Sequence, residues 1–293
     1  MKKNLFAKIV TTAALMTIDG ALFSFGWPVK NLDTEKMVPS FARNQRNRFN
    51  TSFTFPNAQK AVAADNGKII AEITEHQNDG DWFESPLGNA AIISHNDDLI
   101  SVYANLDAKS ALNLQEKFQV SDGQELGDIA SSAWTENPQN GSMEFQIADT
   151  KAKTYINPLI LMPRSIKPPR IYFDGVTIEN QFGRSYNLAT LRSVPAGPYT
   201  LYKKRQPTVS PHRVKVYVNG TELERISKEV LKWQDGKILI AGNKNYTSKQ
   251  FYPSDDTELL GHVLLPHGVN TITITASDIL ENSVTANYTI SGY

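Results

Sequence analysis

The chain has 293 residues, of which 40% are hydrophobic and 20% charged, so it can form two domains with separate cores and is too apolar to be disordered throughout. Its 30 basic and 30 acidic residues balance, which excludes a global electrostatic attraction to nucleic acid or to an anionic membrane. It contains no cysteine, and this excludes disulfides, thiolate zinc sites and a cysteine nucleophile.

The first residues have the features of an export signal. Two lysines precede a mostly apolar run over residues 5–25, and the small residues Ser24 and Gly26 occupy the positions that a signal peptidase reads before Trp27. Two charged residues interrupt the run, which argues against a permanent transmembrane span because each would be costly at the centre of a bilayer. We therefore expect residues 1–26 to be a signal peptide and the protein to be exported to a periplasm, cell envelope or extracellular space; a buried N-terminal helix is the alternative.

Residues 27–163 have the pattern of a compact all-β domain. Short apolar runs are separated by Asp65–Gly67, Ser121–Gly123 and Asn140–Gly141, turn sequences that supply the positive φ of a tight reversal. The pattern predicts an antiparallel sheet or sandwich. The expected strands cover residues 49–55, 68–73, 89–94, 99–103, 116–120 and 142–147.

A proline-rich linker over residues 164–169 leads to a second expected domain, residues 170–293. Apolar and polar residues alternate there, as over 214–218 and 272–276, and this alternation is typical of a sandwich sheet with one face buried. The segment Gly268–Asp278 also resembles the closing strands of bacterial immunoglobulin-like domains. The expected fold class is therefore all-β, an antiparallel sheet domain followed by an immunoglobulin-like β-sandwich.

Three segments have two interpretations each. Thr221–Trp233 is either a helix opened by the Thr221 and Glu224 capping pair or part of a hairpin around Asn219-Gly220. The aromatic loop 244–256 either packs on its own sandwich or exposes its rings to a glycan or protein. Two basic clusters are expected to be solvated loops, with polyanion binding as the alternative. They are Arg43, Arg46 and Arg48, and Lys203, Lys204 and Arg205.

Residues 27–163 also resemble the lysostaphin-type (LytM-like, duplicated hybrid motif) zinc endopeptidases, which cleave peptide cross-bridges in bacterial peptidoglycan. The matching sequence includes Trp27–Val29, Lys60–Ile69, Gly88–His95, the tyrosine-x-x-leucine of Tyr103–Leu106, and Gly123–Gly127, followed by Phe145–Ile147 and Asn157–Leu159. The resemblance implies a β-sheet groove that holds a catalytic zinc ion and an extended peptide.

The positions that this family uses for catalysis carry other residues here. The histidine and aspartate of its histidine-x-x-x-aspartate motif fall on Asn50 and Thr54, and its histidine before leucine falls on Asn105. Its histidine-x-histidine falls on Ser142 and Glu144, of which Glu144 alone is a good zinc ligand. A catalytic zinc needs about three protein ligands. The resemblance therefore implies a pseudo-enzyme in which zinc is lost and these five positions line the groove.

Two other residues are expected to be structural near the groove. His95 ends an apolar strand and is expected to be a hydrogen-bonded histidine, and Tyr103 belongs to the matched strand. A second mixture of possible ligands, His76, Asp79, Asp81 and Glu84, is expected to be a solvated loop.

Three functions fit these observations. The favoured one is a non-catalytic envelope protein that binds a peptidoglycan peptide or a partner cell-wall hydrolase, with the peptide lying along the groove and pairing with strand backbone. The second is an active zinc metalloendopeptidase with unorthodox ligands, Glu144 with His95 or His76. The third is an adhesin or surface-assembly module. None of the three involves nucleic acid or an integral membrane segment.

Overall fold

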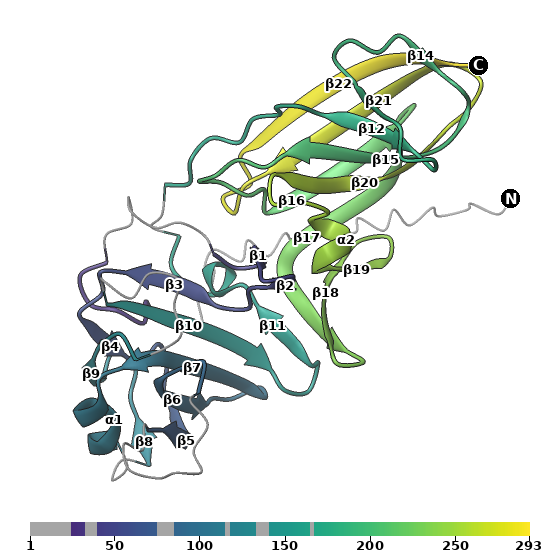
Figure 1. The fold of residues 1–293 in the computed structure, drawn as a ribbon. Coiled ribbons are helices and arrows are strands. Elements are labelled where there is room, and N and C mark those ends of the chain that lie inside the picture. The colour runs from purple at the N-terminus through teal and green to yellow at the C-terminus, as the bar shows by residue number, and fades with distance from the viewer. Residues whose placement is uncertain (1–24, 33–39, 75–84, 115–117, 133–140, 165–166) are drawn as a thin grey trace, which may run out of the picture.

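The computed structural model describes residues 25–32, 40–74, 85–114, 118–132, 141–164 and 167–293. Over these residues the fold is all-β and forms two lobes, residues 25–164 and 167–293 (Figure 1). The strands pair antiparallel, except for the short pair of β14 (Ser193–Val194) with β22 (Ser283–Gly292). The expected all-β, antiparallel fold class is confirmed.

The first lobe is built on a sheet centred on β10 (Ser142–Asp149). One edge of β10 pairs with β7 (Leu99–Leu106), and the other pairs with β3 (Phe53–Pro56) and then with β11 (Thr154–Ile156). The sheet continues from β7 through three more strands. They are β6 (Asn89–Ser94), β5 (Gly67–Ile73) and β8 (Gln119–Val120).

Shorter elements cover the ends of this sheet. β1 (Asn44–Gln45) and β2 (Arg48–Phe49) form a hairpin, and β4 (Lys60–Val62) pairs with β9 (Glu125–Asp128). The helical turns are α1 (Ala108–Leu114) and η1 (Pro158–Ile160).

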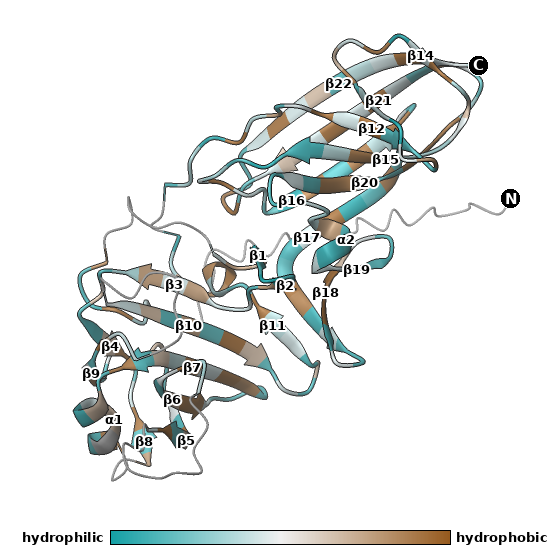
Figure 2. Cartoon of the chain, viewed as in Figure 1, coloured by the Kyte–Doolittle hydropathy of each residue, from teal (hydrophilic) through white to brown (hydrophobic). Residues whose placement is uncertain are grey.

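Side chains on β10 alternate between the two faces of the sheet, because successive Cβ atoms on a strand point in opposite directions. Met143, Phe145 and Ile147 are fully buried in the core of the first lobe, whereas Glu144 and Gln146 point to the other face. Figure 2 shows this alternation of hydrophobic and hydrophilic residues on strands of both lobes. The sheet thus has one dry face and one face that is open to a ligand.

The second lobe is a β-sandwich. Its four-stranded sheet has the order β13 (Ser185–Asn187), β12 (Thr177–Asn180), β15 (Gly197–Lys204) and β20 (Thr257–Leu265). The opposite sheet contains β14, β22, β21 (Gly268–Ser277), β16 (Arg213–Val218) and β17 (Thr221–Gln234). Leu201 and Leu260 of one sheet and Val216 and Ile274 of the other are fully buried between them.

Strand β17 joins the two lobes into one 14-stranded sheet. Its first half pairs with β16, and its residues Val230–Lys232 pair with Thr154–Ile156 of β11 in the first lobe. Its end turns back into β18 (Lys237–Ala241), followed by β19 (Asn245–Thr247) and α2 (Ser248–Phe251). The segment Thr221–Trp233 is therefore a strand of a hairpin around Asn219-Gly220, where both residues have the positive φ that such a turn requires, and not a helix.

A third hydrophobic core lies between the lobes. Phe49 of β2 packs against Phe251 and Tyr252, with ring centroids 5.8 and 6.0 Å apart, and Leu231 and Ile240 join the cluster. The rings of the 244–256 segment are buried there, so this loop packs on its own protein and does not display them.

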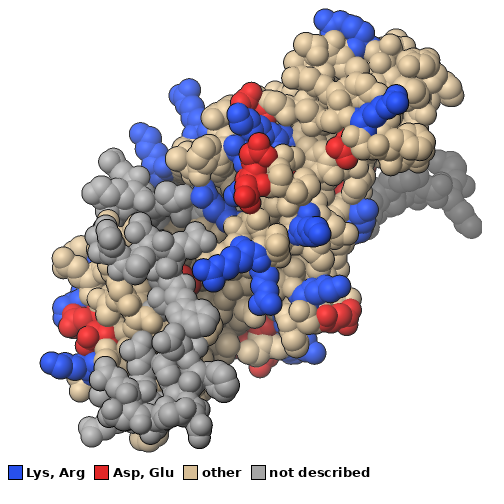
Figure 3. Space-filling model, in the orientation of Figure 1, with Lys and Arg blue, Asp and Glu red and all other residues tan. Residues whose placement is uncertain are grey.

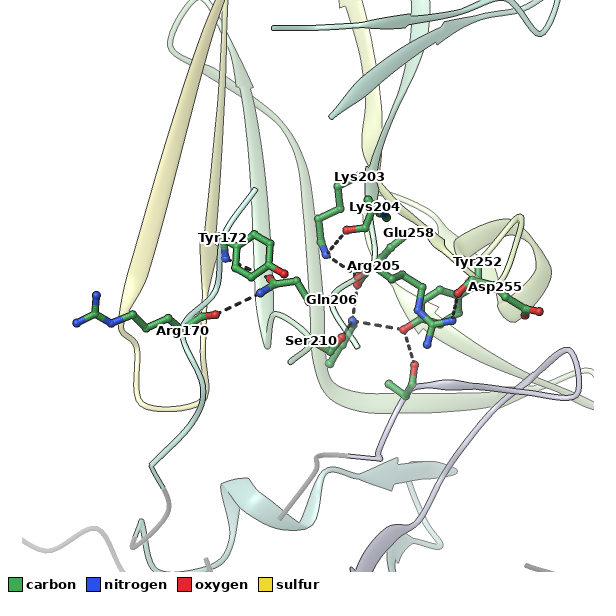
Figure 4. Close-up of polar contacts among 12 residues, drawn as sticks. Arg170, Tyr172, Lys203, Lys204, Arg205, Gln206, Ser210, Tyr252, Asp255 and Glu258 are labelled. Carbon is green, nitrogen blue, oxygen red and sulfur yellow. Dashed lines mark hydrogen bonds and ion pairs between the residues drawn. The ribbon is translucent and has the colours of Figure 1, made fainter. Parts of the chain in front are cut away.

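Buried charges accompany this core. Lys203 and Lys228 are both within 3.0 Å of the Glu258 carboxylate, and all three side chains are almost completely buried. Figure 4 shows the ion pair of Lys203 with Glu258. The expectation that residues 203–205 form a solvated cluster is therefore wrong for Lys203, since β15 alternates and places this side chain inward. Arg43 is also partly buried, whereas Arg46 and Arg48 are exposed as expected.

Some expected boundaries differ from the structure. The strand expected over 116–120 is described only at Gln119–Val120. Residues 1–24 of the expected signal peptide lie outside the described residues, but Phe25 is buried against His95 with ring centroids 4.9 Å apart. The folded part of the chain therefore begins no later than Phe25, ahead of the cleavage site expected after Gly26.

Candidate binding groove

A groove of about 540 Å³ lies on the open face of β10 and β7. Its floor is formed by Val102, Ala104, Glu144 and Gln146, and one wall comes from the β1–β2 hairpin and the residues that follow it. The remaining lining residues are Pro86 and Leu87 of the first lobe and Ile238 of β18 in the second. A separate cavity at the lobe junction has a volume of about 50 Å³, room for little more than ordered water, so the groove is the better candidate site.

Among the described residues that line the groove, Glu144 alone is acidic. Strand register places it directly opposite Thr54 on β3 and Ala104 on β7, and directly opposed residues point to the same face of a sheet. Ser52, two residues before Thr54, brings its hydroxyl oxygen to 3.2 Å from Glu144 Oε2.

Asn50 extends this polar chain. Asn50 Oδ1 accepts a hydrogen bond from the Ser52 backbone N–H at 2.9 Å and lies 2.8 Å from the Ser52 hydroxyl. A serine hydroxyl has one proton to donate, so it cannot donate to Asn50 and Glu144 together. Both contacts become hydrogen bonds when Glu144 is protonated and donates to Ser52.

Burial raises the pKa of Glu144 above its ordinary value, and the contact with Ser52 offsets this only in part. Apart from that contact, no hydrogen bond or ion pair joins the Glu144 side chain to any residue within the described part of the chain. The groove floor therefore holds a desolvated carboxyl group that can make further hydrogen bonds to a ligand.

The other positions taken from the peptidase motifs lie nearby, but not all line the groove. Thr54 and Ser142 lie on the same face of the sheet as Glu144, beside the lining residues. Asn105 is 1% exposed, and its amide group donates to the carbonyl of Ser142 and accepts from the backbone N–H of Ser132. The structure thus brings all five positions together, with Asn105 committed to holding β7 beside the start of β10 and not available to a ligand.

His95 and Tyr103 have structural roles. His95 Nδ1 lies 2.8 Å from the Asn66 carbonyl oxygen, and its Nε2 lies 2.6 Å from the Ser101 hydroxyl. Tyr103 is fully buried, its hydroxyl accepts a hydrogen bond from the Ala64 N–H at 2.8 Å, and burial raises the pKa of Tyr103. Ser101 and Tyr103 alternate with Val102 and Ala104 of the groove floor, so His95 and Tyr103 lie on the core side of the sheet.

These positions do not assemble a zinc site. His95 is on the opposite face of the sheet from Glu144, and His76, Asp79, Asp81 and Glu84 lie outside the described residues. Throughout the described ranges, no three His, Cys, Asp or Glu side chains cluster as metal ligands would. The donor set at the motif positions is one carboxylate with amides and hydroxyls, which Zn²⁺ does not favour, so these residues do not fit the metal.

Sequence reasoning missed several residues of the groove. Ser52 and Gln146, whose amide donates to Thr51, belong to strands that were expected, and their alternation with the buried residues was the available signal. Ile238 carried no such signal, because it reaches the groove only through the pairing of β17 with β11.

The comparisons with known proteins concern part of the chain. A protein-family model matches residues 170–292, the second lobe. An uncharacterized protein of Treponema pallidum (strain Nichols) is 30% identical over 125 residues, which are 40% of this chain and 82% of that protein. The chain belongs to the family of this protein. Among the helices that the structure describes, none is long and apolar enough to cross a membrane.

Proposed function

We propose that the protein is an exported, non-catalytic relative of the lysostaphin-type peptidases that binds a peptide of peptidoglycan, or a partner hydrolase, in the groove. The observation that carries this proposal is the convergence of Asn50, Thr54, Asn105, Ser142 and Glu144. They come from three separate stretches of sequence, residues 50–54, 105 and 142–144, and lie close together with no imidazole ligand among them, and Asn50 and Glu144 line the groove. Such convergence is expected if the first lobe keeps the peptidase scaffold and has lost the metal ligands.

Recognition in this proposal occurs through side chains. Both edges of β10 and β7 are already paired, so an added peptide strand cannot bond to their backbone. Asn50, Glu144 and Gln146 instead offer amide and carboxyl groups to the backbone of a peptide that lies across them. The sequence-based expectation of backbone pairing along the floor is replaced by this arrangement.

Sedimentation with purified peptidoglycan sacculi tests the function. The full chain should sediment with sacculi without releasing soluble fragments, and Asn50→Ala with Glu144→Ala should abolish sedimentation. Glu179→Ala with Thr200→Ala is the matched control, because these residues line a different groove on the second lobe. Release of soluble muropeptides would overturn the non-catalytic assignment, and absence of sedimentation would favour an adhesin or assembly module.

Restoring the metal ligands tests kinship with the peptidase scaffold. Asn50→His, Thr54→Asp and Glu144→His together should bind about one equivalent of zinc, because opposed residues on neighbouring strands have Cβ atoms roughly 5 Å apart and Asn50 is linked to Glu144 through Ser52. Metal content by plasma mass spectrometry is the measurement. The control is the Asn50→His, Glu144→His double variant, which lacks the third ligand. Equal zinc in the double and triple variants would contradict the scaffold assignment.

A further inference from the structure

The β1–β2 hairpin presents two arginines at the mouth of the groove. Arg46 and Arg48 both line it and both are exposed. Figure 3 shows basic side chains over this hairpin. Neither guanidinium group has a hydrogen bond, an ion pair or an aromatic contact with any residue that the structure describes. Among the described residues, the mouth of the groove therefore carries two cations with no paired carboxylate, although the chain as a whole has no net charge.

The backbone at this point is strained. Arg46 and Asn47 form the turn between the strands, with φ of 50° and 63°. This is the left-handed backbone conformation that the residues Asn-Gly most often adopt in hairpin turns. Asparagine tolerates it, whereas an arginine there is disfavoured, and strain of this kind gathers at functional sites. Folding alone would be served better by glycine at position 46.

The hairpin is also held in place from outside. Phe49 is packed between Phe251 and Tyr252, and the Ser248 hydroxyl donates to Asn44 Oδ1 at 2.9 Å. The hairpin backbone that carries the arginines is thus held at the mouth by the second lobe. A rigid support of this kind keeps a binding group in position before the ligand arrives.

We propose that Arg46 and Arg48 form a carboxylate-binding site, which orients a peptide with a free carboxylate at the groove mouth and its backbone over Asn50 and Glu144. Guanidinium groups match a carboxylate with paired hydrogen bonds, whereas the floor residues Val102, Ala104, Glu144 and Gln146 offer it no cation, and this difference fixes the direction of the peptide. This inference rests on the proposed function in that the ligand is a peptide.

The probes are two forms of acetyl-tetraalanine, the free acid and the C-terminal amide. Each is titrated into the full chain, and binding is followed by NMR. The free acid should bind about tenfold more tightly than the amide, as expected for a charge-assisted contact, and the preference should fall at high salt. Arg48→Ala should reduce the preference for the free acid, and the double variant Arg46→Gly, Arg48→Ala should remove it. Arg46→Gly should leave the protein at least as stable as the wild type, because glycine relieves the strained φ at position 46.

The matched controls are Lys153→Gly, another exposed cation with positive φ, 54°, and Arg184→Ala, an exposed arginine of the second lobe. Neither residue lines the groove, so both variants should keep the acid preference. Equal binding of acid and amide, or a preference that survives in the double variant, would overturn the carboxylate site.

The site and the proposed function can fail separately. If the carboxylate site is overturned but the protein still binds sacculi, the proposed function stands without the site. If the free acid binds through the arginines but sacculi do not bind, the site stands and the peptidoglycan assignment fails.

Discussion

At the scale of single residues, burial of Glu144 raises the pKa of its carboxyl group and so sets the charge of the groove floor. Its carboxyl group contacts the Ser52 hydroxyl, and among the described residues no cation pairs with it. Burial therefore favours the protonated form of Glu144, and the contact with Ser52 offsets this only in part.

Glu144→Gln should stabilise the protein at neutral pH. A raised pKa means that the contribution of Glu144 to stability is fully present below its unfolded-state pKa of about 4.3 and is lost as the pH rises through the folded-state pKa. The glutamine variant, whose amide can donate to Ser52 at any pH, should unfold at higher urea concentration than the wild type at pH 7.5 and at a similar one at pH 4.

The exposed Asp174→Asn is the carboxylate-to-amide control and should not reproduce this difference between pH 4 and pH 7.5. A wild-type protein that is more stable than Glu144→Gln at pH 7.5 would show that the ionised carboxylate is well accommodated.

Glu258 is the opposite case. Burial raises its pKa, but the ammonium groups of Lys228 and Lys203 outweigh burial and hold the pKa of Glu258 below its ordinary value, to about 2. The two lysines depend on this one carboxylate, since burial by itself lowers the pKa of Lys228.

Glu258→Gln should destabilise the protein by about 3–5 kcal/mol, because it leaves two buried ammonium groups without a counter-charge. Urea unfolding at pH 7 measures the loss. In the wild type this contribution should be present above pH ~4.3 and decline as the pH falls toward the folded-state pKa. The control is Glu281→Gln, which removes an exposed partner of Arg213 and should cost less than about 1 kcal/mol. Equal losses in the two variants would show that the junction cluster contributes little.

At the scale of elements, the sequence predicts strands well where alternation is regular and turns carry glycine. β5, β6, β10, β16 and β21 lie close to their expected ranges for this reason. The strand β17 was ambiguous, because Leu223, Ile226 and Val230 also suit one face of a helix, and a bulge in its pairing with β16 blurs the period of two. Tertiary pairing with β16, β11 and β18 decides its conformation.

The candidate site was predictable only through motif spacing. The five motif positions were located by their order along the chain, and they do converge. Their individual roles were not predictable, because whether Asn105 faces a ligand or a carbonyl group depends on its positive φ of 71°. Arg46 and Arg48 were noted as a basic cluster, but their place at the groove follows from the docking of the hairpin on α2, a contact between residues about 200 apart in sequence.

At the scale of the whole molecule, the two lobes share a strand, a core and an ion cluster. We expect them to unfold together, because separating them would expose the Phe49, Leu231 and Phe251 core and break the pairing of β11 with β17. Scanning calorimetry should show one transition with equal calorimetric and van't Hoff enthalpies. Two resolved transitions would mean that the junction is weaker than its contacts suggest.

Strand β17 also gives the molecule a mechanical property. A tension applied between the lobes acts on the three residue pairs that join β17 to β11. Because β17 also pairs with β18, the tension reaches Ile238, which is part of the groove wall. A pull on the sandwich would therefore be passed to a strand that forms part of the groove wall. Ligand binding in the groove and tension on the second lobe would in this way affect each other through the pairing of β17 with β11.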